Sequence, residues 1–380
     1  MAVCHAQPDW AALSCSRTAH ADELAPFKAL GADAAAAHAV NAITREVVPH
    51  HPVFAHFRPW RGTPAPGMLT DFLGMTIPRA TFCNPSYANA ENHAIRVRQC
   101  ERLAELPSGA RLLTAWPVVA EEYFEYVYVL EAVLQYSREE RGTRIAARRP
   151  FAFVELGAGY GHWTWTAHQA LQQLVPATPH QYLLVDTQTS LGPFIREIAR
   201  NHSVEQGAVH FHSGKVYRAG RRRLIGWGQD EWLRANRMKV PLPRESPPVR
   251  LRKLLSDHQM PCVLDLVDID LDRGEYSLFA DPDTAVVLTQ RARRVHMGLH
   301  DFTRNASRRH AADPFAQFYS APARNTPIIG QFRAFGWEVQ RLWPSVTRRG
   351  VTEWGPVAFG DGVASLLNLN FSAAVAHANC

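Results

Sequence analysis

The sequence predicts an α/β fold whose C-terminal part is an open, mostly parallel sheet with helices on both faces. Short apolar runs alternate with helical patterns from Arg149 onward. The first of these runs ends in a glycine-rich turn at 157–161, and the second ends in Asp186. Strands that alternate with helices are typical of open parallel sheets, whose ligands bind beyond the carboxyl ends of the strands.

The predicted elements follow one another in a regular order. Strands are expected at 151–156, 181–186, 208–213, 262–270, 295–301, 337–342 and 356–361. Helices are expected at 165–175, 191–201, 249–258 and 284–290. The stretch 218–248, rich in Arg and Pro, is interpreted as an insertion between the third and fourth strands.

The N-terminal part lacks this alternation. Residues 21–48 are rich in alanine and predict a helix, whereas 50–92 combine Pro, Gly and aromatic residues without periodicity. A long helix is expected within 118–142, because apolar residues recur there at three- and four-residue steps. We therefore divide the chain into an N-terminal extension, 1–110, mainly helical or irregular and a candidate substrate-shaping cap, and a domain over 111–380.

Composition indicates a globular protein without a metal site. Hydrophobic residues make up 46% and charged residues 20% of the chain, and no apolar stretch approaches the roughly 20 residues of a membrane helix. The first residues lack a basic region followed by an apolar one, so a cytoplasmic location is expected. None of the six cysteines forms a C-x-x-C pair, so we expect reduced thiols and assign no metal ligand.

The net charge of +6 raises the question of a nucleic-acid partner. All but four of the 41 basic residues are arginine, and they are dispersed in short clusters. This distribution indicates a compositional bias and a solvated surface, so no nucleic acid and no membrane are expected as partners. We expect a small-molecule acceptor instead.

The glycine turn in FAFVELGAGYGHW, residues 151–163, distinguishes between two kinds of ligand. A dinucleotide fingerprint requires G-x-G-x-x-G, and His162 occupies the place of its third glycine. Glu155 would also repel a pyrophosphate, whereas it would suit a cationic nucleoside such as S-adenosylmethionine. The candidate donor-binding residues of the turn are Glu155, Gly157, Ala158, Gly159 and Gly161.

Acidic residues end two further strands. Asp186 follows YLLV, where a carboxylate can accept hydrogen bonds from both ribose hydroxyls. Asp268 and Asp270, in LDLVDIDLD, lie on one face of the fourth strand if that strand continues to residue 270. We expect Asp186 and Asp268 to contact the donor, although a turn or a helix cap would also account for such acids.

Several blocks between residues 113 and 370 resemble the FkbM-type S-adenosylmethionine-dependent methyltransferases. FVELGAGYGHW is similar to the glycine motif of that family, CVLDLVDIDLDRGE to its "vDllkiDvEGaE" block, and VHMGLHD to its histidine-bearing strand. The chain departs from the pattern at Asp268, where the family has lysine, and at Asp272-Arg273, where it has Glu-Gly. These departures affect the substrate side of the loop more than the fold.

The resemblance implies a class I methyltransferase (Rossmann-like) fold with a seven-stranded, mostly parallel sheet that contains one antiparallel strand. It also implies S-adenosyl-L-methionine as cofactor and methyl transfer to an oxygen of a sugar, polyketide or other small molecule. A hydroxyl acceptor needs a general base, and the candidates are Asp270 and His300.

Two other functions compete with this interpretation. One is a nicotinamide-dependent oxidoreductase, which His162 and Glu155 argue against. The other is a non-catalytic interaction protein with a degenerate methyltransferase fold, which the intact turn and Asp186 argue against.

Overall fold

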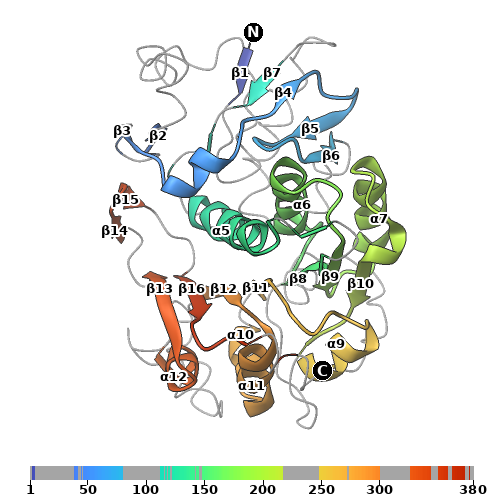
Figure 1. The fold of residues 1–380 in the computed structure, drawn as a ribbon, viewed down its shortest axis with the longest axis vertical. Helices are drawn as coiled ribbons and strands as arrows, with labels where there is room; N and C mark the ends of the chain where they lie inside the picture. The colour runs from blue at the N-terminus through green and yellow to red at the C-terminus, as the bar shows by residue number, and fades with distance from the viewer. Residues whose placement is uncertain are drawn as a thin grey trace, which may run out of the picture.

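The structure is a computed structural model, shown as a ribbon in Figure 1. It describes residues 2–4, 38–41, 44, 46–79, 112–114, 116–117, 119, 122–141, 143–144, 148–216, 248–271, 274–299, 326–343, 350–357, 362–372 and 376. All of the insertion expected at 218–248 except its last residue lies outside these residues, as does His300.

A seven-stranded sheet forms the centre of the protein. Its strands, from one edge to the other, are β10 (Val209–Ser213), β9 (His180–Asp186), β8 (Phe151–Leu156), β11 (Leu266–Ile269), β12 (Arg294–Leu299), β16 (Gly362–Asn368) and β13 (Trp337–Trp343). Only β16 runs antiparallel to its neighbours. Numbered along the chain, the strand order is 3-2-1-4-5-7-6, the order of the class I methyltransferase fold, so the predicted fold class is confirmed.

Helices cover both faces of this sheet (Figure 1). One face carries α5 (Tyr123–Glu139), α6 (His162–Leu174) and α7 (Leu191–Asn201). The other carries α9 (Leu251–Asp257), α10 (Glu275–Phe279), α11 (Pro282–Arg291) and α12 (Thr326–Ala334). A short 3-10 helix, η5 (Gln206–Ala208), leads into β10.

The alternation of side chains along β8 explains why the sheet has two cores. Phe151 and Phe153 belong to the cluster that contains α5, α6 and α7, whereas Ala152 and Val154 belong to the cluster on the other face. Every residue of β8 is buried, as expected for a parallel strand covered on both sides.

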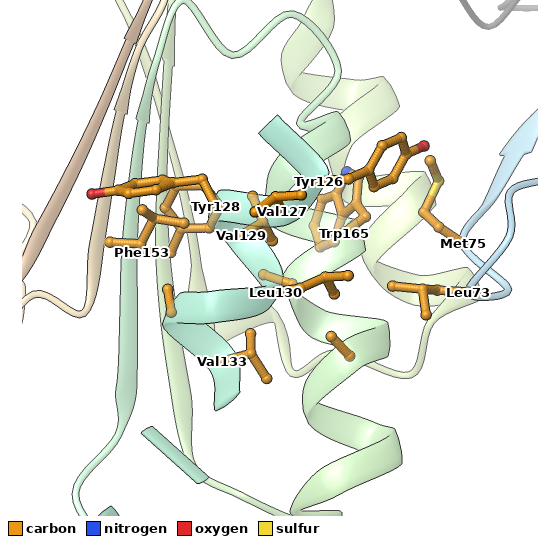
Figure 2. Packing of buried hydrophobic residues seen from close by; sticks show 14 of the residues in the cluster. Leu73, Met75, Tyr126, Val127, Tyr128, Val129, Leu130, Val133, Phe153 and Trp165 are labelled. Atoms are coloured by element: carbon orange, nitrogen blue, oxygen red, sulfur yellow. The ribbon is translucent and has the colours of Figure 1, made fainter. Parts of the chain in front are cut away.

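Part of the N-terminal extension shares a core with the sheet domain. It contributes η2 (Pro52–His56), β4 (Arg61–Gly62) and the hairpin of β5 (Met68–Thr70) and β6 (Thr76–Pro78). Figure 2 shows Leu73 and Met75, from the loop of this hairpin, facing Tyr126 of α5 and Trp165 of α6. The role of the extension as a substrate-shaping cap stays a prediction.

Two predictions of local structure are wrong in the described residues. Within 21–48, where a helix was expected, His38–Val40 (β2) pairs with Val47–Pro49 (β3), because the two valines favour a strand and Pro49 ends it. The strand that pairs with β13 is β16, which lies after the strand expected at 356–361. Residues Gly355–Val357 form β15, which pairs with β14 (Gly350–Thr352) outside the main sheet.

The remaining described elements lie near the N-terminus. Strand β1 (Ala2–Cys4) pairs with β7 (Leu112–Thr114), which also pairs with β4.

Cys262 is disulfide-bonded, so the expectation of reduced thiols is wrong for this residue. Within the described part of the chain, no helix is long and apolar enough to cross a membrane.

Candidate functional site

The glycine turn connects the carboxyl end of β8 to the start of α6. Gly157, Gly159 and Gly161 all have positive φ angles, of 87°, 52° and 85°. Only glycine adopts this backbone region at no steric cost, which explains the three glycines of the motif. The amides of Gly157 and Ala158 both donate to the carbonyl of Val185, at 2.8 and 2.9 Å, so the turn is attached to β9.

The three glycines have different surroundings. A Cβ on Gly157 would overlap the carbonyl oxygen of Asp270, and one on Gly161 would overlap the side chain of Leu184. A Cβ on Gly159 would have no heavy atom within 4 Å. Gly157 and Gly161 are therefore required by packing within the protein, whereas Gly159 borders open space.

Asp186 lies at the carboxyl end of β9, beside the turn. Its Oδ2 atom accepts from the amide of Gly159 at 3.0 Å, and its Oδ1 atom accepts from the amide of Gln188 at 2.8 Å. The carboxylate therefore orients the turn as well as facing the space next to Gly159. An ionised carboxylate in this position is of the kind that accepts hydrogen bonds from ligand hydroxyls.

Glu155 is buried below the turn, with 2% of its surface exposed. Its Oε2 atom accepts from both the amide and the hydroxyl of Thr164 in the first turn of α6. Burial raises the pKa of this carboxyl to about 7, and the hydrogen bonds from Thr164 oppose that shift. Glu155 thus ties β8 to α6 and supports the turn from beneath.

The structure describes one of the two catalytic candidates, Asp270. Asp270 follows β11 directly, is exposed, and donates its amide to the carbonyl of Leu156 at 2.8 Å. It therefore lies beside the glycine turn, as the sequence predicts. His300 follows β12 and lies outside the described residues, so its role as base stays a prediction.

Asp268 shares the face of β8 and β11 that α5 and α6 cover. It is paired in register with Glu155 on one side and with His296 on the other, and only 4% of its surface is exposed. Asp268 and Glu155 belong to separate patterns in the sequence. Their adjacency depends on β11 pairing with β8, which no local sequence signal reveals.

A polar contact at the start of α6 was not predicted from the sequence. The hydroxyl of Tyr126 in α5 lies 3.1 Å from Nε2 of His162, and the imidazole of His162 stacks on Trp163 at 4.2 Å between centroids. Burial lowers the pKa of His162 to about 3, so this imidazole is neutral at physiological pH. The only signal in the sequence was that His162 replaced a glycine.

A cavity of about 360 Å³ lies at the opposite end of the sheet, where β12 begins and β16 ends. Its lining residues are Gln135, Glu139, Arg293, Leu367, Asn368, Leu369 and Phe371. None of them is a predicted site residue, and this end of a parallel sheet is not where ligands of such folds bind. Among the described residues, no group of three or more His, Cys, Asp or Glu side chains is arranged to hold a metal ion.

Comparison with known proteins gives remote likenesses of fold. No protein-family model and no curated protein sequence matches the chain. Solved structures that resemble it include the METTL16 MTase domain, with 7% identity, a TM-score of 0.32, and 64% of this chain and 68% of that one covered. Another is a putative RNA methyltransferase from Pyrococcus horikoshii, with 12% identity, a TM-score of 0.29, and 64% and 82% covered.

A third similar structure is an rRNA methylase from Streptococcus thermophilus, with 10% identity, a TM-score of 0.27, and 58% and 88% covered. Two of these three proteins are thus described as RNA or rRNA methyltransferases. The expectation that no nucleic acid is a partner is contradicted by this finding, and we withdraw it. The dispersed arginines were not a sufficient reason for that exclusion. The strand order of the sheet makes the core of this chain a class I methyltransferase fold.

Proposed function

We propose that the protein is an S-adenosylmethionine-dependent methyltransferase of the FkbM type that methylates a hydroxyl oxygen of a small molecule. The observation that carries this proposal is the glycine turn, with Asp186 beside it. The turn lies at the carboxyl end of β8, between β9 and β11, where the chain reverses its direction of strand addition. In open α/β sheets this switch point is where ligands bind.

The residues of the turn fit the proposed donor. Gly159 leaves open space where any other residue would place a Cβ. Asp186, which accepts from the amide of Gly159, is a carboxylate, the kind of group that accepts hydrogen bonds from ribose hydroxyls. Glu155 lies below the surface, so we assign it to holding the turn in shape. Gly157 and Gly161 support the same shape through their packing.

The donor supplies a methyl group that is already activated by a sulfonium. The chain must therefore orient the acceptor in line with that group and accept the proton of its hydroxyl. We assign this proton to Asp270, which is exposed beside the turn, or to His300, which follows β12. We assign the N-terminal extension, whose described residues share a core with α5 and α6, to shaping the acceptor site.

Thermal unfolding with ligands tests the proposal. S-adenosylhomocysteine is expected to raise the melting temperature, whereas NAD⁺ and NADH are not, because only a ligand of the folded state stabilises it. The Asp186→Ala variant should lose this stabilisation, and Arg252→Ala, on the surface of α9, should keep it. A shift with NADH and none with S-adenosylhomocysteine would support the oxidoreductase alternative instead.

A radiolabelled donor then identifies the acceptor class. Transfer of the methyl label is measured with hydroxylated small molecules and, in parallel, with RNA. Labelled RNA together with unlabelled small molecules would contradict the small-molecule part of the proposal and leave the methyltransferase part intact.

A further inference from the structure

A row of buried polar side chains crosses the sheet just below the glycine turn. Asp268 of β11 pairs in register with Glu155 of β8 and with His296 of β12. Residues paired in this way project from the same face of a sheet, which here is the face covered by α5. Glu155, Asp268 and His296 are exposed by 2%, 4% and 3%, so all three are withdrawn from water.

The charge of this row is unbalanced around Asp268. Burial raises the pKa of Asp268 well above its usual range, and the carboxyls of Glu155, Asp270 and Glu125 raise it further. The amide of Ile269 is the group that lowers it. Burial and these neighbours favour the protonated form of the Asp268 carboxyl, because an ionised one would have to share a buried site with other carboxyls.

His296 does not supply the missing positive charge. Burial, with a smaller effect of Arg341, lowers the pKa of its imidazole to about 3. Its Nδ1 atom lies 3.1 Å from the hydroxyl of Ser365, which fixes the ring. Its Nε2 atom is fully buried, has no hydrogen-bond partner within the described structure, and lies 3.8 Å from Oε1 of Glu125. A buried nitrogen without a partner costs about 1–3 kcal/mol, and this neutral ring does not offset the carboxyls beside it.

The row is connected directly to the proposed donor site. Two residues after Asp268, the amide of Asp270 donates to Leu156, and the carbonyl of Asp270 lies against Gly157. We propose that Asp268 makes the site distinguish the donor, which carries a cationic sulfonium, from its product, which carries an uncharged thioether. This inference rests on the proposed function. A cation bound above the row favours the ionised carboxyl and expels its proton to solvent, whereas the neutral thioether leaves the proton in place.

The direction of the pH dependence follows from this exchange. Below the pKa of Asp268 in the free protein, binding of the cation releases a proton, so affinity for the donor increases with pH. The gain is at most tenfold per pH unit for one proton. Affinity for the thioether does not share this gain. The titratable groups that face Asp268 are Glu155, Asp270, Glu125 and His296.

Calorimetric titration of wild type and Asp268→Asn with S-adenosylmethionine and with S-adenosylhomocysteine, from pH 6 to 8.5, tests the proposal. For wild type, the ratio of the Kd of the thioether to the Kd of the sulfonium should rise more than tenfold over this range. For Asp268→Asn it should rise much less. The α-amino groups of the ligands also titrate, but they do so with both proteins, so the difference between the proteins isolates Asp268.

Three controls separate the outcomes. Asp186→Ala should weaken both ligands without changing the slope of their ratio with pH. Proton release by wild type, measured in buffers of different ionisation enthalpy, should be up to one proton larger with the sulfonium, and this readout does not require the Asn variant to fold. Equal proton release with both ligands, or the same slope in both proteins, would overturn the inference while leaving the donor site in place. Failure of both ligands to bind wild type would overturn the proposed function itself.

Discussion

Replacing Gly159 by alanine is expected to weaken donor binding more than tenfold at little cost to stability. Replacing Gly157 by alanine is expected mainly to destabilise the fold. Both residues have positive φ angles, so alanine is strained at either position by about 1–2 kcal/mol. At Gly159 nothing lies within 4 Å of the new Cβ, so strain is the whole cost to the free energy of unfolding.

At Gly157 the new Cβ would overlap the carbonyl of Asp270, and the ends of β8 and β11 would have to separate. Overpacking adds about 1–3 kcal/mol, and weakening of the hydrogen bond from Asp270 to Leu156 adds about 1 kcal/mol. The total for Gly157→Ala is therefore about 3–6 kcal/mol, against about 1–2 kcal/mol for Gly159→Ala.

Thermal unfolding and calorimetric titration with S-adenosylhomocysteine measure both effects. Gly159→Ala should lower the melting temperature by a few degrees, at about 2–4 °C per kcal/mol, and weaken the ligand more than tenfold. Gly330→Ala, within α12 and with nothing near its Cβ, is the matched control: it should keep the affinity and raise the melting temperature slightly, because alanine favours a helix more than glycine does. Wild-type affinity in Gly159→Ala would refute the assignment of the turn to the donor, and equal melting temperatures for the two turn variants would refute the argument from Asp270.

Other variants test the surroundings of the site. Burial raises the pKa of Asp71 to about 7, although the amides of Leu73 and Met75 donate to its carboxyl. The free energy of unfolding is therefore highest below the pKa that Asp71 has in the unfolded chain, and it falls as the pH rises toward 7. Asp71→Asn should remove most of this loss, up to about 4 kcal/mol between pH 4 and 8 in urea unfolding, and an unchanged pH profile would contradict the assignment. Arg149→Ala leaves Asp265 buried without its bidentate partner and should cost about 3 kcal/mol or more in the same assay, whereas Arg252→Ala, at an exposed ion pair, should cost less than about 1 kcal/mol. His300→Ala should keep donor affinity within twofold and slow methyl transfer to the identified acceptor by about 100-fold, and undiminished transfer would leave Asp270 as the base.

The local character of most elements could be predicted from the sequence because it depends on neighbours in the chain. The apolar run 151–156 and the glycines after it identify a buried strand and a tight turn without reference to the rest of the protein. The helix predicted at 191–201 has the same bounds in α7, because its apolar residues all lie on one side. Of the strand expected at 356–361, the described residues Pro356 and Val357 pair outside the main sheet, and β16 pairs with β13 instead.

By itself, the sequence determined the alternation of strands and helices from β8 to β12, the turn at 157–161 and the acid at the end of β9, since each is a pattern of adjacent residues. Only the tertiary structure decided which acids meet. Asp268, Glu155 and His296 are far apart in the chain, and strand pairing brings them into one row. The electrostatics of the site depends on that row, because the energy of a buried charge is set by neighbours in space and by exclusion of water rather than by residue type.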